Sequence, residues 1–304
     1  MTARERDVRE MCDFLSRRDQ KRGGRAGRTA LVAYLRTDVA DLLSGHFPTE
    51  DIRRNMTSAA AELAYLAGWT AFDGGEHPLA LRWLTAATNL AEEAGDAPLA
   101  GHTLRAMAHQ AVDLGKPQQA VRLAEASLSR RRYAQACWRE RSLLGVVYAR
   151  GLAASGEKKA AVAALLQAER DLNRASASDD EPNRVFFFGE ASLAHETAAA
   201  LRDLGDLPGS ERQFRHSVRT RRGEFTRTHA VTLGYLGAVQ AQQGHLDLAC
   251  ETWNQALDAM AGVQSGRARE TVVQMRRALS PFRGRAGSRA AELDARARTA
   301  LGVG

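Results

Sequence analysis

A short pattern of small residues repeats along this chain. A glycine is followed five residues later by a small residue, and seven residues after that by a second one. A glycine of this kind ends a helix, and small residues seven apart lie on one face of the next helix, where a neighbour can pack closely. The pattern therefore predicts five helical hairpins stacked into a solenoid. Its five copies are Gly75/Ala80/Ala87, Gly115/Ala120/Ser127, Gly156/Ala161/Ala168, Gly205/Ser210/Ser217 and Gly244/Ala249/Ala256.

The spacing of the glycines sets the length of each hairpin. Successive glycines are 40, 41, 49 and 39 residues apart, which is longer than the roughly 34 residues of a tetratricopeptide repeat. We expect a loop at 175–183 to account for the longest interval. Prolines that follow a glycine, Pro78 and Pro117, support helix starts at those points. The helix pairs are predicted at 50–74 with 78–94, 98–114 with 117–130, 134–155 with 158–174, 184–204 with 208–221, and 226–243 with 246–261.

The composition agrees with an all-α fold. Aromatic residues make up 6% of the 304 residues and there are 7 prolines, which disfavours a sandwich or barrel of strands. We expect two helices before the array, at 4–21 and 28–44, and two capping helices after it, at 266–279 and 287–301. The prediction is a tetratricopeptide-like helical-hairpin solenoid in one continuous domain. Its parts are N-terminal helices at 1–49, the repeat array at 50–261 and capping helices at 262–304.

The net charge of +7 comes almost entirely from arginine. Only four of the 43 basic residues are lysine, a bias that a GC-rich genome would also produce. Arginines gather at Arg17–Arg28, Arg130–Arg132 and Arg219–Arg222, which are helix ends or loops where solvated cations suit the helix dipole. The charge alone therefore does not predict a nucleic-acid interface.

The sequence has no feature of a membrane or exported protein. It has no apolar run long enough to span a bilayer, and its first residues are too polar for a signal peptide. Cys12, Cys137 and Cys250 are too far apart in sequence for a metal knuckle or redox pair, so we interpret them as small buried residues. These observations favour a cytoplasmic protein.

Several segments resemble the tetratricopeptide-like regulatory region of actinobacterial helix-turn-helix transcription regulators. The most specific runs from Ala61 to Asp73 (AELAYLAGWTAFD), and the resemblance covers nearly the whole chain. The other segments are Gly75 with the helix at 80–95, Arg28–Leu35, Glu181-Pro182 with Phe186–Phe188, Leu201–Gly205 and Ser265–Arg267.

The chain departs from the pattern of these regulators at its N-terminus, because it starts where their helix-turn-helix domain would end. The resemblance therefore implies a stand-alone sensor or adaptor, or a regulator without its DNA-binding part. Residues 1–21 form at most one helix, and 28–44 carry an apolar core face, so no recognition helix is expected. We do not expect direct sequence-specific binding to DNA.

The first helix of each hairpin is expected to line a concave groove. Aligning the repeats on their small residues places one set of polar and aromatic side chains on that surface. The set comprises Glu62, Tyr65, Trp69, Asp73, His102, Arg105, His109, Asp113, Arg150, His195 and Arg202.

This groove set suits ligand binding better than catalysis. Tyr65 and Trp69 offer stacking surfaces, although packing between helices explains Trp69 equally well. Arginine side chains at 105, 150 and 202 could clamp a carboxylate or phosphate, and carboxylates at 73 and 113 could accept from an amine. A peptide, a small charged molecule and a protein partner all fit.

The histidines of the groove do not predict a metal site. His102 and His109 are seven residues apart on one helix, about 10 Å, and cannot share a metal unless His195 or a carboxylate converges on them. We expect no metal and no cofactor, and the simplest interpretation of each histidine is a hydrogen-bonded groove or core residue.

No catalytic motif occurs: there is no Walker loop, nucleophile elbow, HExxH or dinucleotide fingerprint. The first hypothesis is a non-catalytic regulatory module that binds a ligand or peptide and signals to a protein partner. The second is a docking scaffold without a ligand. An unrecognised biosynthetic enzyme using groove histidines and aspartates is a third alternative, and a homodimer is left open.

Overall fold

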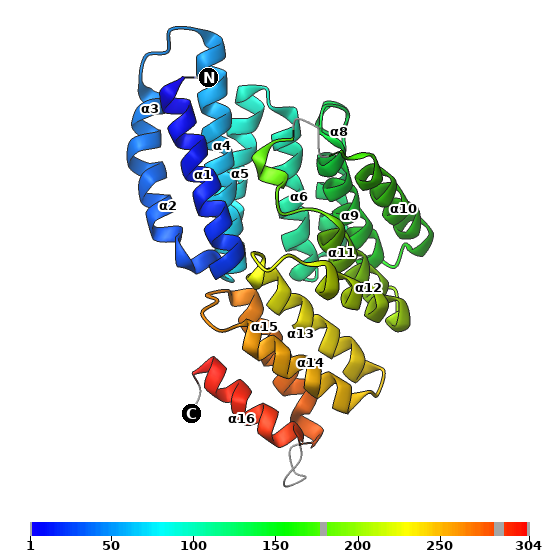
Figure 1. Ribbon diagram of the computed structural model, residues 1–304. Coiled ribbons are helices and arrows are strands. Elements are labelled where there is room, and N and C mark those ends of the chain that lie inside the picture. The colour runs from blue at the N-terminus through cyan, green and yellow to red at the C-terminus, as the bar shows by residue number, and fades with distance from the viewer. Residues whose placement is uncertain (1, 177–180, 283–288, 303–304) are drawn as a thin grey trace.

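The computed structural model describes residues 2–176, 181–282 and 289–302, and this part of the chain contains helices and no strands (Figure 1). The five predicted hairpins are present and stack into a curved tetratricopeptide-like solenoid, which confirms the predicted fold class. They are α4 (Glu50–Asp73) with α5 (His77–Ala94), α6 (Ala97–Asp113) with α7 (Pro117–Ser127), α9 (Trp138–Ala154) with α10 (Lys158–Arg174), α11 (Glu190–Asp203) with α12 (Leu207–Thr220), and α13 (Thr226–Gln242) with α14 (Leu246–Ala259).

The glycines and small residues of the repeat have the structural roles that their spacing predicts. The five glycines take positive φ angles between 66° and 85°, a backbone conformation that costs glycine little. All ten small residues that follow them are fully buried, with 0% exposure. Any larger side chain there would separate the two helices of a hairpin. The small residues therefore set the helix spacing throughout the array.

The two helices of each hairpin play different roles. In α4 every residue from Met56 to Asp73 is buried, whereas α5 buries only Ala80, Leu84, Ala87 and Ala91. The same contrast holds between α6 and α7 and between α9 and α10. First helices are thus enclosed inside the molecule, and second helices form its outer layer.

Helices flank the array at both ends. Before it come α1 (Ala3–Arg22) and a broken second helix, α2 (Arg28–Tyr34) and α3 (Ala40–Ser44), joined by a π-helical turn at Leu35–Val39. After it come α15 (Gly266–Leu279) and α16 (Arg289–Leu301), with residues 287 and 288 of the predicted last helix outside the described part. The predicted helix at 28–44 is therefore interrupted, because the π turn shifts its hydrogen-bond register.

Two predicted helix starts differ from the structure. Residues 131–134 form a separate short helix, α8 (Arg131–Ala134), and α9 begins only at Trp138. Residues 183–185 form a 3₁₀ turn (Asn183–Val185) and α11 begins at Glu190, so the predicted helix at 184–204 starts too early. The loop predicted at 175–183 is present at its described ends, and its residues 177–180 lie outside the description.

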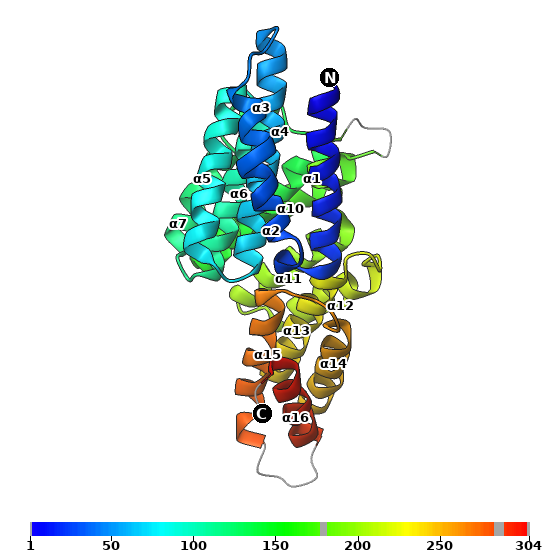
Figure 2. The same cartoon turned by 90° about the vertical axis from the view of Figure 1, so that its left-hand side faces the viewer.

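The N- and C-terminal parts meet across the array. Helix α1 packs on α4 and reaches the start of α13 (Figures 1 and 2). The backbone N–H of Gln264 donates to the Arg22 carbonyl over 2.6 Å, and the N–H of Arg25 donates to the Gln264 carbonyl over 3.2 Å. Gly23 touches the Gln264 backbone so closely that a Cβ atom there would overlap it. These contacts join residues 22–25 to the segment just before α15.

Candidate functional site

Nine of the eleven predicted groove residues are buried, all except Asp113 and Arg202. The expectation of an open concave surface at these nine positions is therefore wrong. The physical reason is that other parts of the chain fill the groove: α1, the start of α15, and residues 181–188, called here the crossing segment. Figure 1 shows the crossing segment, in light green, in front of α6 and α9 before the chain enters α11.

Arg184 anchors the crossing segment. Its guanidinium donates to both carboxylate oxygens of Glu140, over 2.8 and 3.0 Å, and to Glu62 over 3.2 Å. Glu140 is fully buried, which on its own would raise the pKa of its carboxyl, but Arg184 and His102 together lower that pKa to about 2. The segment is thus held against the first helices by a buried, charge-assisted contact.

His102 is held in its neutral form. Its Nδ1 lies 3.0 Å from Glu140, and its Nε2 lies 3.0 Å from the Arg105 guanidinium, which can only donate. Burial and the neighbouring Arg105 lower the pKa of His102 to about 4. A proton on Nε2 would face a guanidinium N–H, so the imidazole accepts there and donates to Glu140.

Arg105 is a buried cation without an acidic partner. It is 1% exposed and donates to the Tyr65 hydroxyl over 2.8 Å, and its guanidinium carbon lies 5.5 Å from the centre of the Trp69 ring. Within the described residues no carboxylate lies within 4 Å of its nitrogens. The predicted stacking residues therefore already hold a cation from the chain itself.

Asp73 joins distant parts of the molecule. Its carboxylate accepts from the backbone N–H of Gly24 over 2.9 Å, from the Ser265 hydroxyl over 2.9 Å and from Arg227 over 3.3 Å. Arg227 also pairs with Asp19 of α1 over 3.2 Å, and burial raises the pKa of Asp19 to about 6. The predicted amine acceptor Asp73 is thus fully used in holding the N-terminal part, the array and the C-terminal part together.

A second buried network surrounds His109. Its Nε2 accepts from Arg150 over 3.2 Å and from Arg267 over 3.3 Å. Burial, and to a smaller extent the charges of these arginines, holds the pKa of His109 well below its usual range. Arg150 donates to Glu196 over 2.9 Å, and Asp113 lies 3.5 Å from Arg150. The predicted residues 109, 113 and 150 therefore do meet, but as partners of one another.

The last two predicted residues make their hydrogen bonds to residues outside this network. His195 contacts the Thr232 hydroxyl over 2.8 Å, and burial with the Arg221 charge holds its pKa well below the usual range. Arg202 pairs with Asp203 over 2.8 Å. Together with Arg150 it lines an open cavity of about 780 Å³ between α9, α11 and α15.

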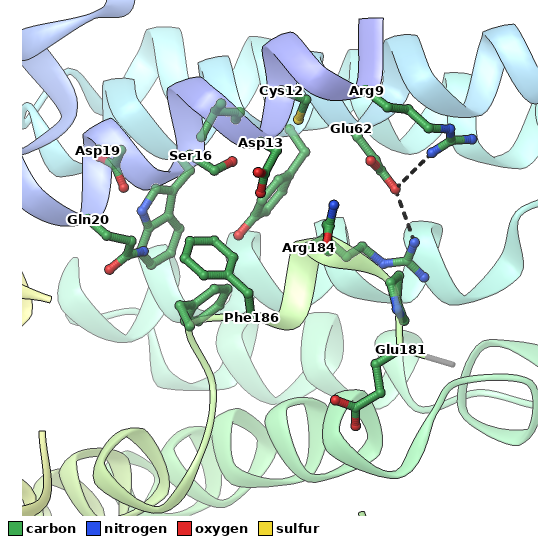
Figure 3. Close-up of a pocket in the computed structure, with 16 residues that line it drawn as sticks. Arg9, Cys12, Asp13, Ser16, Asp19, Gln20, Glu62, Glu181, Arg184 and Phe186 are labelled. Carbon is green, nitrogen blue, oxygen red and sulfur yellow. Dashed lines mark hydrogen bonds and ion pairs between the residues drawn. The ribbon is translucent and has the colours of Figure 1, made fainter. Parts of the chain in front are cut away.

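A more enclosed cavity of about 300 Å³ lies between α1, α4 and the crossing segment (Figure 3). Its wall includes the predicted groove residues Glu62, Tyr65 and Trp69. Figure 3 shows Arg9 and Arg184 converging on Glu62 at one end and Phe186 lying below Asp13 in the middle. The whole lining is Arg9, Cys12, Asp13, Ser16, Asp19, Gln20, Glu62, Tyr65, Leu66, Trp69, Glu181, Pro182, Asn183, Arg184, Phe186 and Phe187.

Three acidic residues that line this α1–α4 cavity each have one carboxylate oxygen without a hydrogen bond. These oxygens, of Asp13, Asp19 and Glu181, are buried and make no hydrogen bond within the described residues. The second oxygen of each residue pairs with an arginine: Arg17, Arg227 and Arg139 respectively.

The other sequence expectations concern metals, membranes and the arginine clusters. Within the described residues no group of three or more His, Cys, Asp or Glu side chains could hold a metal ion, and no helix is long and apolar enough to cross a membrane. Arginines of the first cluster make contacts inside the molecule: Arg18 donates to the Ala26 carbonyl, Arg25 donates to the Gly74 carbonyl, and Arg28 pairs with Glu76. Their positions are explained by the fold.

Sequence reasoning missed the residues that fill the groove. The burial of Asp19 could have been predicted from the sequence, because Asp19 lies on the same face of α1 as the apolar residues Val8 and Leu15. Arg184 lies two residues after Pro182, at the first position of the helix predicted at 184–204, and nothing local distinguishes it from a solvated arginine. Arg227 and Arg267 lie in the first turns of α13 and α15, where a positive charge is unfavourable because of the helix dipole. Their carboxylate partners compensate for this unfavourable position.

Comparisons with known proteins identify no family for this chain. No family model matches it, and no curated protein matches it. Among solved structures it is similar to a chain from Podospora anserina described as a kinesin light chain with nearly identical tetratricopeptide-like repeats. The two share 19% sequence identity with a TM-score of 0.45, over 66% of this chain and 93% of the other. At that score the fold class rests on the hairpins of this chain itself.

Proposed function

We propose that this chain is a non-catalytic regulatory repeat protein that binds a small charged ligand or a charged peptide end in its groove. The observation that carries the proposal is the α1–α4 cavity, which is partly enclosed and is lined by charged, polar and aromatic side chains. Cavities of this size and lining are typical of small-molecule sites. The wall includes Glu62, Tyr65 and Trp69 of the predicted groove.

The position of the cavity suits a regulatory role. Its wall combines α1, the array and the crossing segment, which are three parts of the chain far apart in sequence. A ligand that binds one arrangement of these parts more tightly than another shifts the population toward it. The change would reach a protein partner, as in the transcription regulators that the sequence resembles.

The test is a thermal-shift screen of small-molecule fractions, because a ligand that binds only the folded state raises the melting temperature. We expect at least one fraction to stabilise the wild type and to lose its effect on Ser16→Leu. Ser16 lines the cavity on α1, so a leucine there occupies its volume. Ser44→Leu, at the exposed end of α3, is the matched control. An equal shift in both variants would place the ligand elsewhere, and no shift from any fraction would refute the proposal.

A protein-docking scaffold without a ligand is the second candidate. It is favoured by exposed apolar side chains on the outer layer, above all Val162 and Leu166, which are one turn apart on α10 and 40% and 49% exposed. If only protein fractions bind, and Val162→Ser with Leu166→Ser abolishes that binding, the scaffold function holds and the ligand proposal fails.

A further inference from the structure

A small, partly enclosed cavity of about 50 Å³ is lined by Trp69 and by residues of the first helices, the crossing segment and α15. It shares Gln20, Trp69 and Phe187 with the α1–α4 cavity but is otherwise separate. The charges on its wall are strongly unequal, with four arginines against the single carboxylate of Glu196. The arginines are Arg105, Arg221, Arg227 and Arg267.

Two of these arginines lack an acidic partner. Arg227 pairs with Asp19 and Asp73, and Arg267 lies 3.5 Å from Asp113. Arg105 and Arg221 have no carboxylate within 4 Å in the described part of the chain. Arg221 donates only to the Ala191 carbonyl and the Ser217 hydroxyl, both over 2.9 Å.

The Nε atoms of Arg105 and Arg221 are also buried without an acceptor. A buried cation that is not compensated by a negative charge is strongly unfavourable. Arg105 is such a buried cation and Arg221 is a partly buried one, and the residues that line the cavity include the single carboxylate of Glu196.

The neighbouring groups respond to an excess of positive charge. His109 and His195 line the same cavity, and burial together with the surrounding arginines holds the pKa of each well below its usual range. Burial and the adjacent Arg227 lower the pKa of Arg221 to about 10. The groups of this wall thus lie in a positive potential.

We propose that this cavity is a binding site for a small oxyanion, a carboxylate or phosphate group, which compensates Arg105 and Arg221. Its volume limits the guest. A water molecule needs roughly 10–15 Å³ of such volume, so the cavity takes about three to five heavy atoms, the size of acetate with four or phosphate with five. Guanidinium groups are the preferred donors to planar and tetrahedral oxyanions. This site goes beyond the proposed function, because it is separate from the α1–α4 cavity and does not require a ligand there.

The test measures stability against urea in sodium acetate, sodium phosphate and sodium chloride at matched ionic strength. Specific binding raises the free energy of unfolding as the logarithm of the anion concentration once that concentration exceeds the dissociation constant, whereas the general effect of salts on the protein surface rises roughly linearly with concentration. We expect the logarithmic response with acetate or phosphate in the wild type, and the anion that acts at the lower concentration identifies the group.

The variants Arg105→Gln and Arg221→Gln remove one cation each and keep an N–H donor. We expect each to need at least about tenfold more anion for the same rise in stability. In anion-poor buffer each should be as stable as the wild type or more stable, because an uncompensated cation has been removed; an arginine needed only for structure would give the opposite result.

Arg132→Gln is the matched control. Arg132 also donates to a backbone carbonyl and a serine hydroxyl, but it has an acidic partner in Glu92. The anion response of this variant should equal that of the wild type. A response that rises only linearly with concentration, or that is the same in all three variants, would overturn the proposal. A logarithmic response that survives Ser16→Leu would separate this site from the α1–α4 cavity.

Discussion

Replacing Asp73 by asparagine tests whether this carboxylate holds the molecule together. The side chain is fully buried and receives three donors: Gly24 N–H on Oδ2, and Ser265 Oγ–H and Arg227 on Oδ1. Asparagine keeps the shape but offers one acceptor oxygen and one NH₂ group. In either orientation at least one buried donor faces the NH₂, and Arg227 loses half of its counter-charge.

The magnitude follows from these two losses. A buried donor left unpaired costs on the order of 1–3 kcal/mol, and removing one partner of a buried ion pair costs about 3–5 kcal/mol. Arg227 retains Asp19, so only part of the second cost applies. We expect Asp73→Asn to lower the free energy of unfolding by about 3 kcal/mol, as measured by urea unfolding followed by both circular dichroism and tryptophan fluorescence.

Asp258→Asn is the matched control, because Asp258 also pairs with an arginine, Arg296, but its side chain is 68% exposed. Exposed pairs contribute about 0–1 kcal/mol. If the two variants differ by less than about 1 kcal/mol, the assignment of Asp73 as the residue that joins the three parts is wrong.

Two further predictions concern acid stability and helix packing. The pKa of His102 is about 4 in the folded chain and about 6.5 when unfolded, so stability is lost as the pH falls from 6.5 toward 4. Because His102→Gln removes the titrating group, the variant should lose about 3 kcal/mol less stability than the wild type over this pH range. Urea titrations that give the same pH dependence for both proteins would contradict this prediction. Gly237→Ala places a methyl group against the buried Trp253 ring and should cost about 1–3 kcal/mol. Gly145→Ala makes an ordinary contact and should change the same melting curve little.

The hairpins could be predicted from the sequence because their determinants are local. Gly75 ends α4 with a φ of 82°, and Ala80 and Ala87 are buried against it seven residues apart. Both features occur within a dozen residues and repeat five times. The sequence repeat was therefore enough to predict the helical array and to predict which helix of each pair faces inward.

The interior of the groove could not be predicted in the same way. Arg227 bonds to Asp19 across 208 residues, and Arg184 bonds to Glu62 across 122. No local pattern relates such positions, and an arginine that becomes buried has the same sequence signature as one in solvent. The burial of the predicted groove residues and the partners that they bind depend on three segments that are distant in sequence.

The junction between residues 22–25 and Gln264 has a mechanical consequence. An open array of helical hairpins touches only its neighbours and can change pitch gradually, like a spring. Here hydrogen bonds between Arg22 and Gln264 and between Arg25 and Gln264 tie one end of the curve to the other. The contacts of Asp73 with Gly24, Arg227 and Ser265 reinforce the same junction. A change of curvature that separates these parts must break both sets of bonds, so it requires the junction to open as a unit instead of small adjustments spread along the array.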